Sequence, residues 1–182
     1  MNKIVLFYDT ETTGLTLHPN VDVSKQPKLI EFGGVLFDAA FNSIEEEFSI
    51  LVNPGEPITE EITKITGITN DDLKDQPTFI ELLPTFRRIF SSCTTVVAHN
   101  LPFDKAIIWG ELKRHGVTDF TWPPNELCTV GLFRDQWGRD PRLIEVYEKF
   151  MGKPYEQTHR ALDDVRALME IFKAADLSDL IQ

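Results

Sequence analysis

The sequence lacks the features that mark secreted, membrane-spanning and disordered chains. Its 182 residues include only two cysteines, Cys93 and Cys128, which form no C-x-x-C pair, so we expect no disulfide framework and a reducing, cytoplasmic setting. The N-terminal apolar run covers only residues 4–8, far below the ~20 apolar residues of a membrane span and too short for a signal peptide. Hydrophobic residues make up 42% and charged residues 26%, which excludes disordered, collagen-like and coiled-coil chains. We therefore expect one unprocessed domain, residues 1–182, without membrane contact.

Positive charge is also scarce. Lys and Arg total 18 against 29 Asp and Glu, which gives a net charge of −11. This balance argues against nucleic-acid binding through a simple basic patch that neutralises phosphates. It does not exclude a nucleic-acid enzyme in which metal ions offset the negative charge.

Several common catalytic motifs are absent as well. There is no G-x-x-x-x-G-K-[ST] loop, so an NTPase is not expected, and no G-x-S-x-G elbow for a nucleophilic serine. The four histidines show no paired spacing with each other or with cysteine, which argues against zinc. The remaining candidates for chemistry are carboxylates.

Apolar periodicity predicts strands first, and then strands that alternate with helices. A short helix is expected between Thr59, as its N-cap, and Gly67, as its stop. Gly33-Gly34 indicates a strand irregularity or a close approach of another segment. The pattern predicts an α/β domain with a mixed sheet covered by helices, the first three strands pairing as a meander. The strands are expected at residues 3–9, 29–38, 44–52, 94–98 and 126–130, and the longer helices at 77–90, 102–115, 128–137, 141–151 and 158–175.

Carboxylates follow two of the expected strands. Asp9 and Glu11 stand two residues apart at the end of the first strand, so both point to the same face. Two like charges there are costly unless a cation holds them, although a solvated strand end or a helix cap would also accommodate them. Asp104 follows the fourth strand and can face the same end of the sheet, or else be an acid that the helix dipole favours. Oxygen ligands of this kind suit Mg²⁺ or Mn²⁺, which favour phosphate chemistry.

His159 and an acid near it begin the last expected helix. On a helix, a separation of five places His159 and Asp164 about 140° apart, at roughly 100° per residue, so Asp163 is the better helical neighbour of the histidine. If His159 instead lies before the first turn, Asp164 can point inward while Asp163 points out. Apolar periodicity favours Asp164 only weakly, and spacing alone leaves the choice open.

Three motifs stand in order along the chain: DTETTGL at 9–15, HNLPFD at 99–104 and HRALDD at 159–164. Together they resemble the motifs of the DEDDh 3′–5′ exonucleases, a family that includes the proofreading epsilon subunit of bacterial DNA polymerase III. The stretch PITEEITKITGIT at 57–69 also resembles its substrate loop. The likeness runs from about residue 3 to 175 and implies a ribonuclease H-like fold, an α/β mixed sheet flanked by α-helices.

The resemblance further implies a site with two Mg²⁺ (or Mn²⁺) ions. Asp9 would bridge both ions, Glu11 and Asp164 would complete the metal shell, and Asp104 would bind directly or through water. The H-x-x-x-x-D spacing of the family selects Asp164 over its neighbour. His159 would be the general base, and a nucleoside 5′-monophosphate would be released from a 3′ end.

The resemblance also implies contacts with the terminal nucleotide. Thr10 would meet the 3′-OH through its backbone, and Asn100 would orient the loop or the sugar. Leu15 and Phe103 would pack against the nucleotide, although plain core packing explains them equally well. Epsilon-type members carry a His before Gly where this chain has Thr66, so we expect no stacking imidazole there. The implied substrate-binding set is Thr10, Leu15, Ile65, Thr66, Asn100 and Phe103.

Other features are expected to serve the fold. His99 should support the strand end rather than bind metal. Cys128, which stands where many members of that family have an Asp, should be structural. The run Glu45-Glu46-Glu47 fits a charged face of an edge strand protected from aggregation.

The expected function is a metal-dependent 3′–5′ exonuclease that acts on single-stranded or frayed DNA, with proofreading or repair as its expected role. The first alternative is a 3′–5′ exoribonuclease or oligonucleotide-degrading enzyme of the same superfamily, since the sequence does not show how a 2′-OH would be read. An alternative of another class is a non-catalytic single-strand binding module. The expected partners are nucleic acid 3′ ends, DNA favoured over RNA, and a DNA polymerase in a separate chain.

Overall fold

Residues 3–181, which the computed structural model describes, form one sheet with helices on both sides. The strands are β1 (Ile4–Thr12), β2 (Leu29–Asp38), β3 (Ser43–Leu51), β4 (Thr95–Ala98) and β5 (Asn125–Cys128). The α-helices are α1 (Glu60–Thr66), α2 (Asn70–Leu73), α3 (Phe79–Ser91), α4 (Leu101–Arg114), α5 (Thr129–Trp137), α6 (Leu143–Met151) and α7 (Ala161–Ala174), and two short 3₁₀ helices are η1 (Val23–Lys25) and η2 (Leu177–Ile181).

The sheet is mixed, as predicted, with the strand order β3-β2-β1-β4-β5. β1, β2 and β3 pair antiparallel as the expected meander. β4 pairs parallel with β1, and β5 pairs parallel with β4. Because β1 and β4 are parallel neighbours, the residues at their carboxyl ends meet at the same edge of the sheet.

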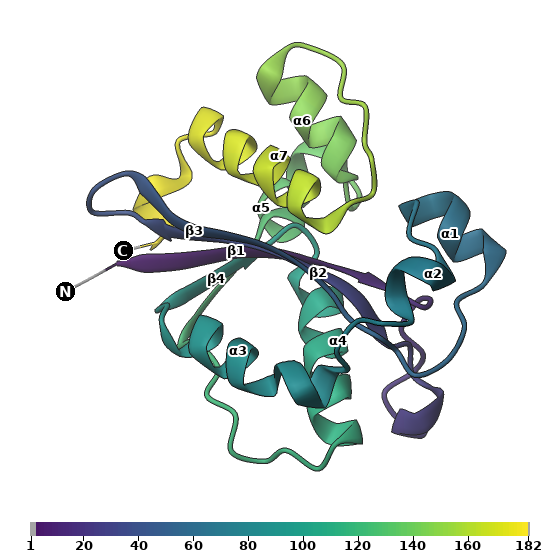
Figure 1. Ribbon diagram of the computed structural model, residues 1–182. Helices are drawn as coiled ribbons and strands as arrows, with labels where there is room; N and C mark the ends of the chain where they lie inside the picture. The colour runs from purple at the N-terminus through teal and green to yellow at the C-terminus, as the bar shows by residue number, and fades with distance from the viewer. Residues whose placement is uncertain (1–2, 182) are drawn as a thin grey trace.

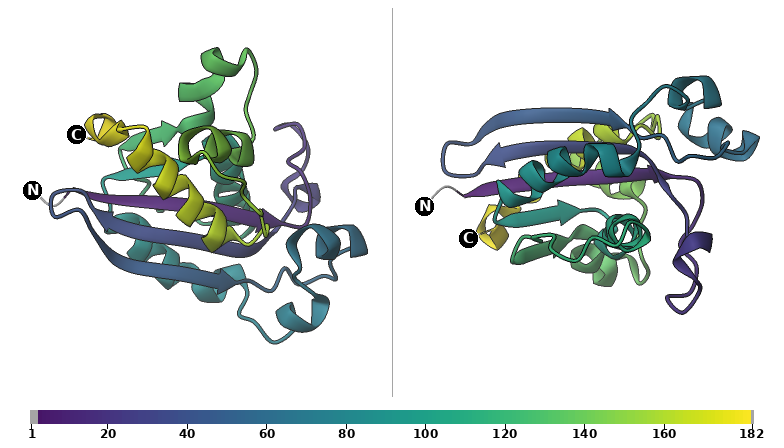
Figure 2. Two further views of the ribbon diagram at one scale, coloured as in Figure 1. Left: turned by 90° about the horizontal axis from the view of Figure 1, so that it is seen from above. Right: turned by 60° about the horizontal axis from the view of Figure 1, so that its bottom comes forward.

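Two helical layers enclose the sheet, with α6 and α7 on one face and α3 and α4 on the other (Figures 1 and 2). Alternation along β1 divides the core between them. Leu6 and Tyr8 join the cluster that contains the buried residues of α3 and α4, while Val5 and Phe7 join the cluster that contains those of α6 and α7. A side chain on β1 therefore belongs to one layer or the other according to its position in this alternation.

The expected helices are confirmed, and the main differences lie at their starts. The helix expected from residue 77 begins at Phe79, because Thr78 and Glu81 form a capping box. The last helix was expected from residue 158 but begins at Ala161, because His159 has a φ of 52°, which ends helical geometry there. The short elements α2, η1 and η2 were not predicted, since each is too short to show a period. Within residues 3–181 no helix has both the length and the apolar character needed to cross a bilayer.

β3 is an edge strand, as its run of acids predicted. Its acids also bind helices on both faces of the sheet. Glu46 accepts two hydrogen bonds from Arg88 of α3, at 2.7 and 2.9 Å. Glu47 forms an ion pair with Arg166 of α7, at 3.0 Å. These acids therefore protect the edge and also link it to the two helical layers.

Candidate active site

Asp9 and Glu11 lie within β1 rather than at its end. The strand continues beyond the predicted residue 9 to Thr12, because its antiparallel pairing with β2 continues. Asp9 lies opposite Gly33, and Glu11 lies opposite Glu31. Asp9 and Glu11 come two and four residues after Phe7 on the strand, so their side chains point to the same face as Phe7, the face covered by α7.

Thr10 points to the opposite face and binds the acid of the second motif. Its backbone N–H and its hydroxyl both donate to Oδ1 of Asp104, at 3.0 and 2.7 Å. Asp104 lies in the first turn of α4, and its side chain is buried. The N–H of Thr10 is therefore already used within the protein, while these two bonds fix Asp104 beside β1.

Gly33 lets α7 approach the sheet at this point. A Cβ atom on Gly33 would lie 2.3 Å from both the carbonyl carbon of Ala161 and the backbone nitrogen of Leu162. The expectation of a close approach at Gly33-Gly34 is thus confirmed at Gly33. Because Gly33 pairs with Asp9, the first turn of α7 is seated directly beside the first carboxylate.

The third motif contributes two side chains, one from the loop before α7 and one from α7 itself. His159 precedes α7 in a left-handed conformation, whereas Asp164 is buried within the first turns of the helix. The hydroxyl group of Tyr155 donates to Oδ1 of Asp164 at 3.0 Å, and the side-chain amide of Gln157 donates to Oδ2 at 2.8 Å. These donors, which the sequence did not indicate, hold the Asp164 carboxylate at the cavity.

Asp163 points away and has other partners. It accepts a hydrogen bond from the hydroxyl group of Thr158 at 2.9 Å, and the Arg166 guanidinium lies 3.5 Å from its other oxygen. His159 lies outside the helix, which is the arrangement in which Asp164 points to the cavity and Asp163 points away from it.

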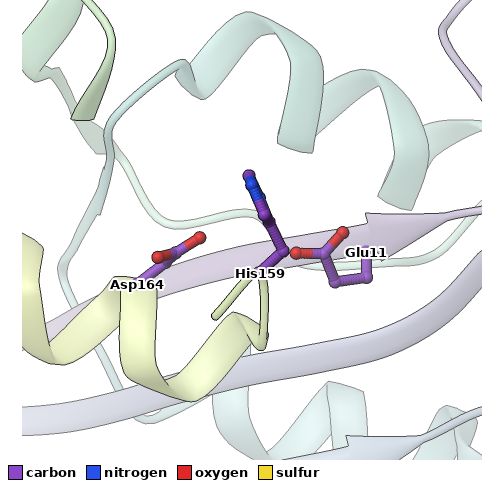
Figure 3. A group of neighbouring side chains, drawn as sticks. All are labelled: Glu11, His159 and Asp164. Carbon is purple, nitrogen blue, oxygen red and sulfur yellow. The ribbon is translucent and has the colours of Figure 1, made fainter. Parts of the chain in front are cut away.

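Glu11, His159 and Asp164 come together beside the last residues of β1 (Figure 3). One potential ligand atom from each lies within 4.8 Å of those of the other two. The side chains come from β1, from the segment before α7 and from α7 itself. A single cation could contact this group only because the sheet and α7 converge here.

A cavity of about 300 Å³ contains most of the predicted site. His99, Arg142, Leu143 and Gln157 also line it, and of these only His99 had been considered from the sequence. The predicted residues that line it are Asp9, Thr10, Glu11, Asn100, Phe103, Asp104, His159 and Asp164.

Three of the predicted substrate contacts lie outside this cavity. The side chains of Leu15 and Ile65 are 82% and 46% exposed, so neither serves as plain core packing. Thr66 is buried, and its hydroxyl group donates to the backbone oxygen of Ile62 at 2.9 Å. The structure therefore leaves Leu15 and Ile65 as exposed apolar side chains outside the cavity and assigns Thr66 to the structure of α1.

Burial and mutual repulsion disfavour the ionised carboxylates. The pKa of Glu11 rises from 4.5 to about 8, first because of burial and then because of the nearby charges of Asp164 and Glu31. Burial, and next the charges of Asp104 and Glu11, raise the pKa of Asp9 well above its ordinary value.

The other two carboxyl groups are shifted in the same direction. Burial raises the pKa of Asp104, and the hydrogen bonds from Thr10 partly oppose this shift. Burial also raises the pKa of Asp164, against the effect of its bonds from Gln157 and Tyr155.

The donor set fits a divalent cation. Among the described residues that line the cavity, Arg142 is the only Lys or Arg, and it is exposed and lies 3.6 Å from Glu145. The protein thus supplies little positive charge to the four carboxylates. Oxygen donors that repel one another in a buried place are the ligands that Mg²⁺ and Mn²⁺ prefer.

His99 and Cys128 have the supporting roles that the sequence predicted. The two ring nitrogens of His99 lie within hydrogen-bond distance of the Thr129 hydroxyl, at 2.9 Å, and of the Pro141 carbonyl, at 3.0 Å. Burial lowers the pKa of His99. The thiol of Cys128 donates to the carbonyl of His99 at 3.5 Å. Both residues therefore connect β4 and β5 to the segments that follow them.

Comparisons with known proteins agree with this geometry. The family model described as "Exonuclease" (RNase_T) matches residues 6–172. The DNA polymerase III subunit epsilon of Treponema pallidum is 36% identical over 172 residues, which cover 91% of this chain and 73% of that protein. The subunit epsilon of Aquifex aeolicus is 37% identical over 166 residues, which cover 90% and 76%. Other curated relatives are much longer, and the chain spans only 10% to 25% of their length.

The fold also matches a solved structure. The nuclease domain of 3′hExo, described as a DEDDh family member bound to rAMP, superimposes with a TM-score of 0.71 at 18% identity, covering 98% of this chain and 93% of that one. The mixed sheet and its two helical layers are thus the ribonuclease H-like fold expected from the motifs. With the family model covering nearly the whole chain, this protein belongs to the exonuclease (RNase_T) family and is a hydrolytic nuclease.

Proposed function

We propose that this chain, as a single exonuclease domain of residues 1–182, hydrolyses nucleotides one at a time from the 3′ end of DNA and releases nucleoside 5′-monophosphates. The observation that carries the proposal is the convergence of Asp9, Glu11, Asp104, Asp164 and His159 on one cavity. Relatives at 36% and 37% identity are subunits of DNA polymerase III, which favours DNA as the substrate.

The proposed cofactors are two Mg²⁺ or Mn²⁺ ions, for which the cavity offers oxygen ligands. Asp9 would contact both ions, Glu11 and Asp164 would complete their ligands, and Asp104 would bind directly or through water. Such a pair of ions stabilises the attacking and leaving oxygens of an in-line displacement at phosphorus. The raised pKa values of the four carboxyl groups support this assignment, because a bound cation would favour their ionised forms.

His159 is the proposed general base. Its ring lies beside the carboxylates of Glu11 and Asp164, on a segment outside the helix. It would accept a proton from the attacking water, whose oxygen bonds to the phosphorus while the bond to the 3′ oxygen of the preceding nucleotide breaks. The shortened strand would retain that oxygen as its new 3′-OH.

The terminal nucleotide would be held by residues on both sides of the carboxylates. Asn100 and Phe103 line the cavity at the start of α4, and the exposed side chains of Leu15 and Ile65 offer apolar surface for a base. Thr10 would contact the 3′ end by its backbone, although its N–H binds Asp104, which leaves the carbonyl for that contact. Thr66 would contribute only by supporting α1.

An RNA substrate is the second candidate. One structural neighbour, with a TM-score of 0.74 at 18% identity over 98% of this chain, is described as recognising the 3′ end of a histone mRNA stem-loop. Degradation of 5′-labelled DNA and RNA single strands of one sequence, each with Mg²⁺ and with EDTA, would separate the two. Faster loss of DNA that stops with EDTA supports the proposal, and faster loss of RNA would overturn the substrate assignment.

Two variants test the chemistry. Asp9→Ala should abolish metal-dependent degradation, and a rate equal to wild type would refute the metal site. His159→Ala should lower the single-turnover rate by roughly 10²–10⁴-fold, the usual contribution of a general base, while metal binding measured by calorimetry stays intact. Strand binding by the wild type without any shortening would instead indicate a binding module.

We also propose a DNA polymerase in a separate chain as partner and the cytoplasm as location. The names of the epsilon-subunit relatives support the first proposal. The free thiols of Cys93 and Cys128 support the second, because such thiols persist in a reducing compartment. Co-purification with a polymerase subunit from the host would test the partner.

A further inference from the structure

A buried acid lies next to the candidate site without belonging to the four carboxylates. Glu31 is 0% exposed near the start of β2, opposite Glu11. Its carboxylate accepts hydrogen bonds from the Arg160 guanidinium at 2.7 to 3.2 Å, from the backbone N–H of Ala161 at 3.1 Å and from the Ser49 hydroxyl at 2.8 Å. An acid with this many partners is fixed in one orientation.

Two of the hydrogen-bond partners of Glu31, Arg160 and Ala161, lie at the start of α7. Arg160 is the residue directly after His159 and is the N-cap of the helix, and Ala161 is the first helical residue. The arginine binds through two nitrogens, Nε and Nη2, so its planar fork sets direction as well as distance. β2 thus holds the backbone on the C-terminal side of His159.

The backbone of His159 requires such support. Its φ of 52° is in the left-handed region, which costs a non-glycine residue roughly 1 kcal/mol or more. On its N-terminal side, the Thr158 hydroxyl donates to Asp163 at 2.9 Å. His159 therefore lies between two residues, Thr158 and Arg160, that are both held by hydrogen bonds. Of the two acids that accept these bonds, Glu31 is the buried one.

We propose that Glu31 and Arg160 form a positioning pair that holds His159 at the reacting phosphate. This inference rests on the proposed role of His159 as the general base. Neither residue of the pair touches the reacting atoms in this role; the pair acts through the histidine. Losing the two-nitrogen contact of Arg160 with Glu31 should lower kcat, because a ~1 Å misplacement of a catalytic group costs up to about 10²-fold in rate. KM and the metal requirement should stay unchanged.

Arg160→Lys is the test variant, because it keeps the positive charge for the buried Glu31 and removes only the fork. Arg166→Lys is the matched control, because Arg166 lies on α7, the helix that Arg160 precedes as N-cap, and pairs in an exposed position with Glu47 of the neighbouring strand β3. Each change is made in the wild type and in a His159→Ala background, with melting temperatures measured for all chains. Single-turnover rates, KM for a DNA oligonucleotide and the half-saturating Mg²⁺ concentration are then compared.

In the wild-type background, Arg160→Lys should lower the rate by about 10- to 100-fold with KM and half-saturating Mg²⁺ within about twofold, and Arg166→Lys should have no such effect. In the His159→Ala background the same Arg160→Lys change should lower the rate by less than about twofold, since effects of residues that act as a unit do not add.

Equal losses in both backgrounds would overturn the positioning role and leave the base intact. A raised KM with unchanged kcat would overturn it in favour of a substrate contact by Arg160, whose side chain is 42% exposed. A His159→Ala variant as fast as wild type would overturn both the positioning role and the proposed base. Glu31→Gln provides a second variant, and it should reproduce the background dependence if the pair acts together.

Discussion

The raised carboxyl pKa values make the folding stability of the metal-free protein fall as pH rises. Glu11 has a pKa of about 8 in the folded chain against 4.5 as its ordinary value. A group whose pKa is raised by folding contributes stability that is complete below its unfolded pKa and is lost as pH rises through its folded pKa. The loss from Glu11 therefore extends from about pH 4.5 to pH 8, and a divalent cation that binds the carboxylates should reverse it.

The structure sets the size of this effect. A shift from 4.5 to about 8 corresponds to an upper bound of about 5 kcal/mol, at about 1.4 kcal/mol per pKa unit. Glu11 is only partly buried, so water screens its charge and we expect less than half of that bound, roughly 2 kcal/mol. For a chain of this length, that corresponds to a fall of about 4–8 °C in melting temperature.

Thermal melts in EDTA between pH 5.5 and 8.5 measure the slope, and the same series with saturating Mg²⁺ measures its reversal. Glu11→Gln is the matched variant, because it removes one titrating group while keeping the shape of the side chain. It also corrects for His99, whose lowered pKa makes its own contribution rise with pH. The reasoning fails if Glu11→Gln is no more stable than wild type at pH 8 in EDTA, or if Mg²⁺ leaves the wild-type slope unchanged.

Two further predictions use neighbouring residues as controls. Asp164→Asn should reduce the single-turnover rate by at least about 10²-fold, whereas Asp163→Asn, which points away from the cavity, should stay within about fivefold; similar losses would contradict the inward placement of Asp164. Gly33→Ala should lower stability by about 1–3 kcal/mol, because its Cβ would overlap the Ala161 backbone, and the rate should fall with it. Gly131→Ala, where a Cβ would meet no atom within 4 Å, should leave melting temperature and rate nearly unchanged.

The parts of the site that lie on regular elements could be predicted from the sequence. Asp9 and Glu11 share a face because strand alternation requires it, and the antiparallel pairing with β2 carries that alternation past the predicted end of the strand. Asp104 reaches the same edge because β4 runs parallel to β1. In these cases local periodicity and the order of the strands determine where each side chain lies.

The parts that depend on irregular backbone could not be predicted in this way. Helical spacing could not choose Asp164, because His159 is not on the helix at all. Tyr155 and Gln157 reach Asp164 from a segment without a period, so no pattern marks them. Glu31 did leave a signal, since it is the one acid within the apolar run LIEFGGVLF, but its partners are distant in sequence.

The acidic residues of the chain form two groups, those outside the candidate site and those that line its cavity. Acids outside the site, such as Glu46, Glu47 and Asp72, bind arginines of the helices or cap a helix, so they stabilise the fold. The acids of the cavity have little protein counter-charge, and Arg142 is the only Lys or Arg among the described residues that line it. A strand that passes the protein at an internal position therefore gains little from phosphate neutralisation. A strand end could in addition place its terminal base on apolar side chains and its last phosphate against the cations that we propose the carboxylates hold. The scarcity of basic residues thus favours action at an end over cleavage within a strand, which agrees with an exonuclease.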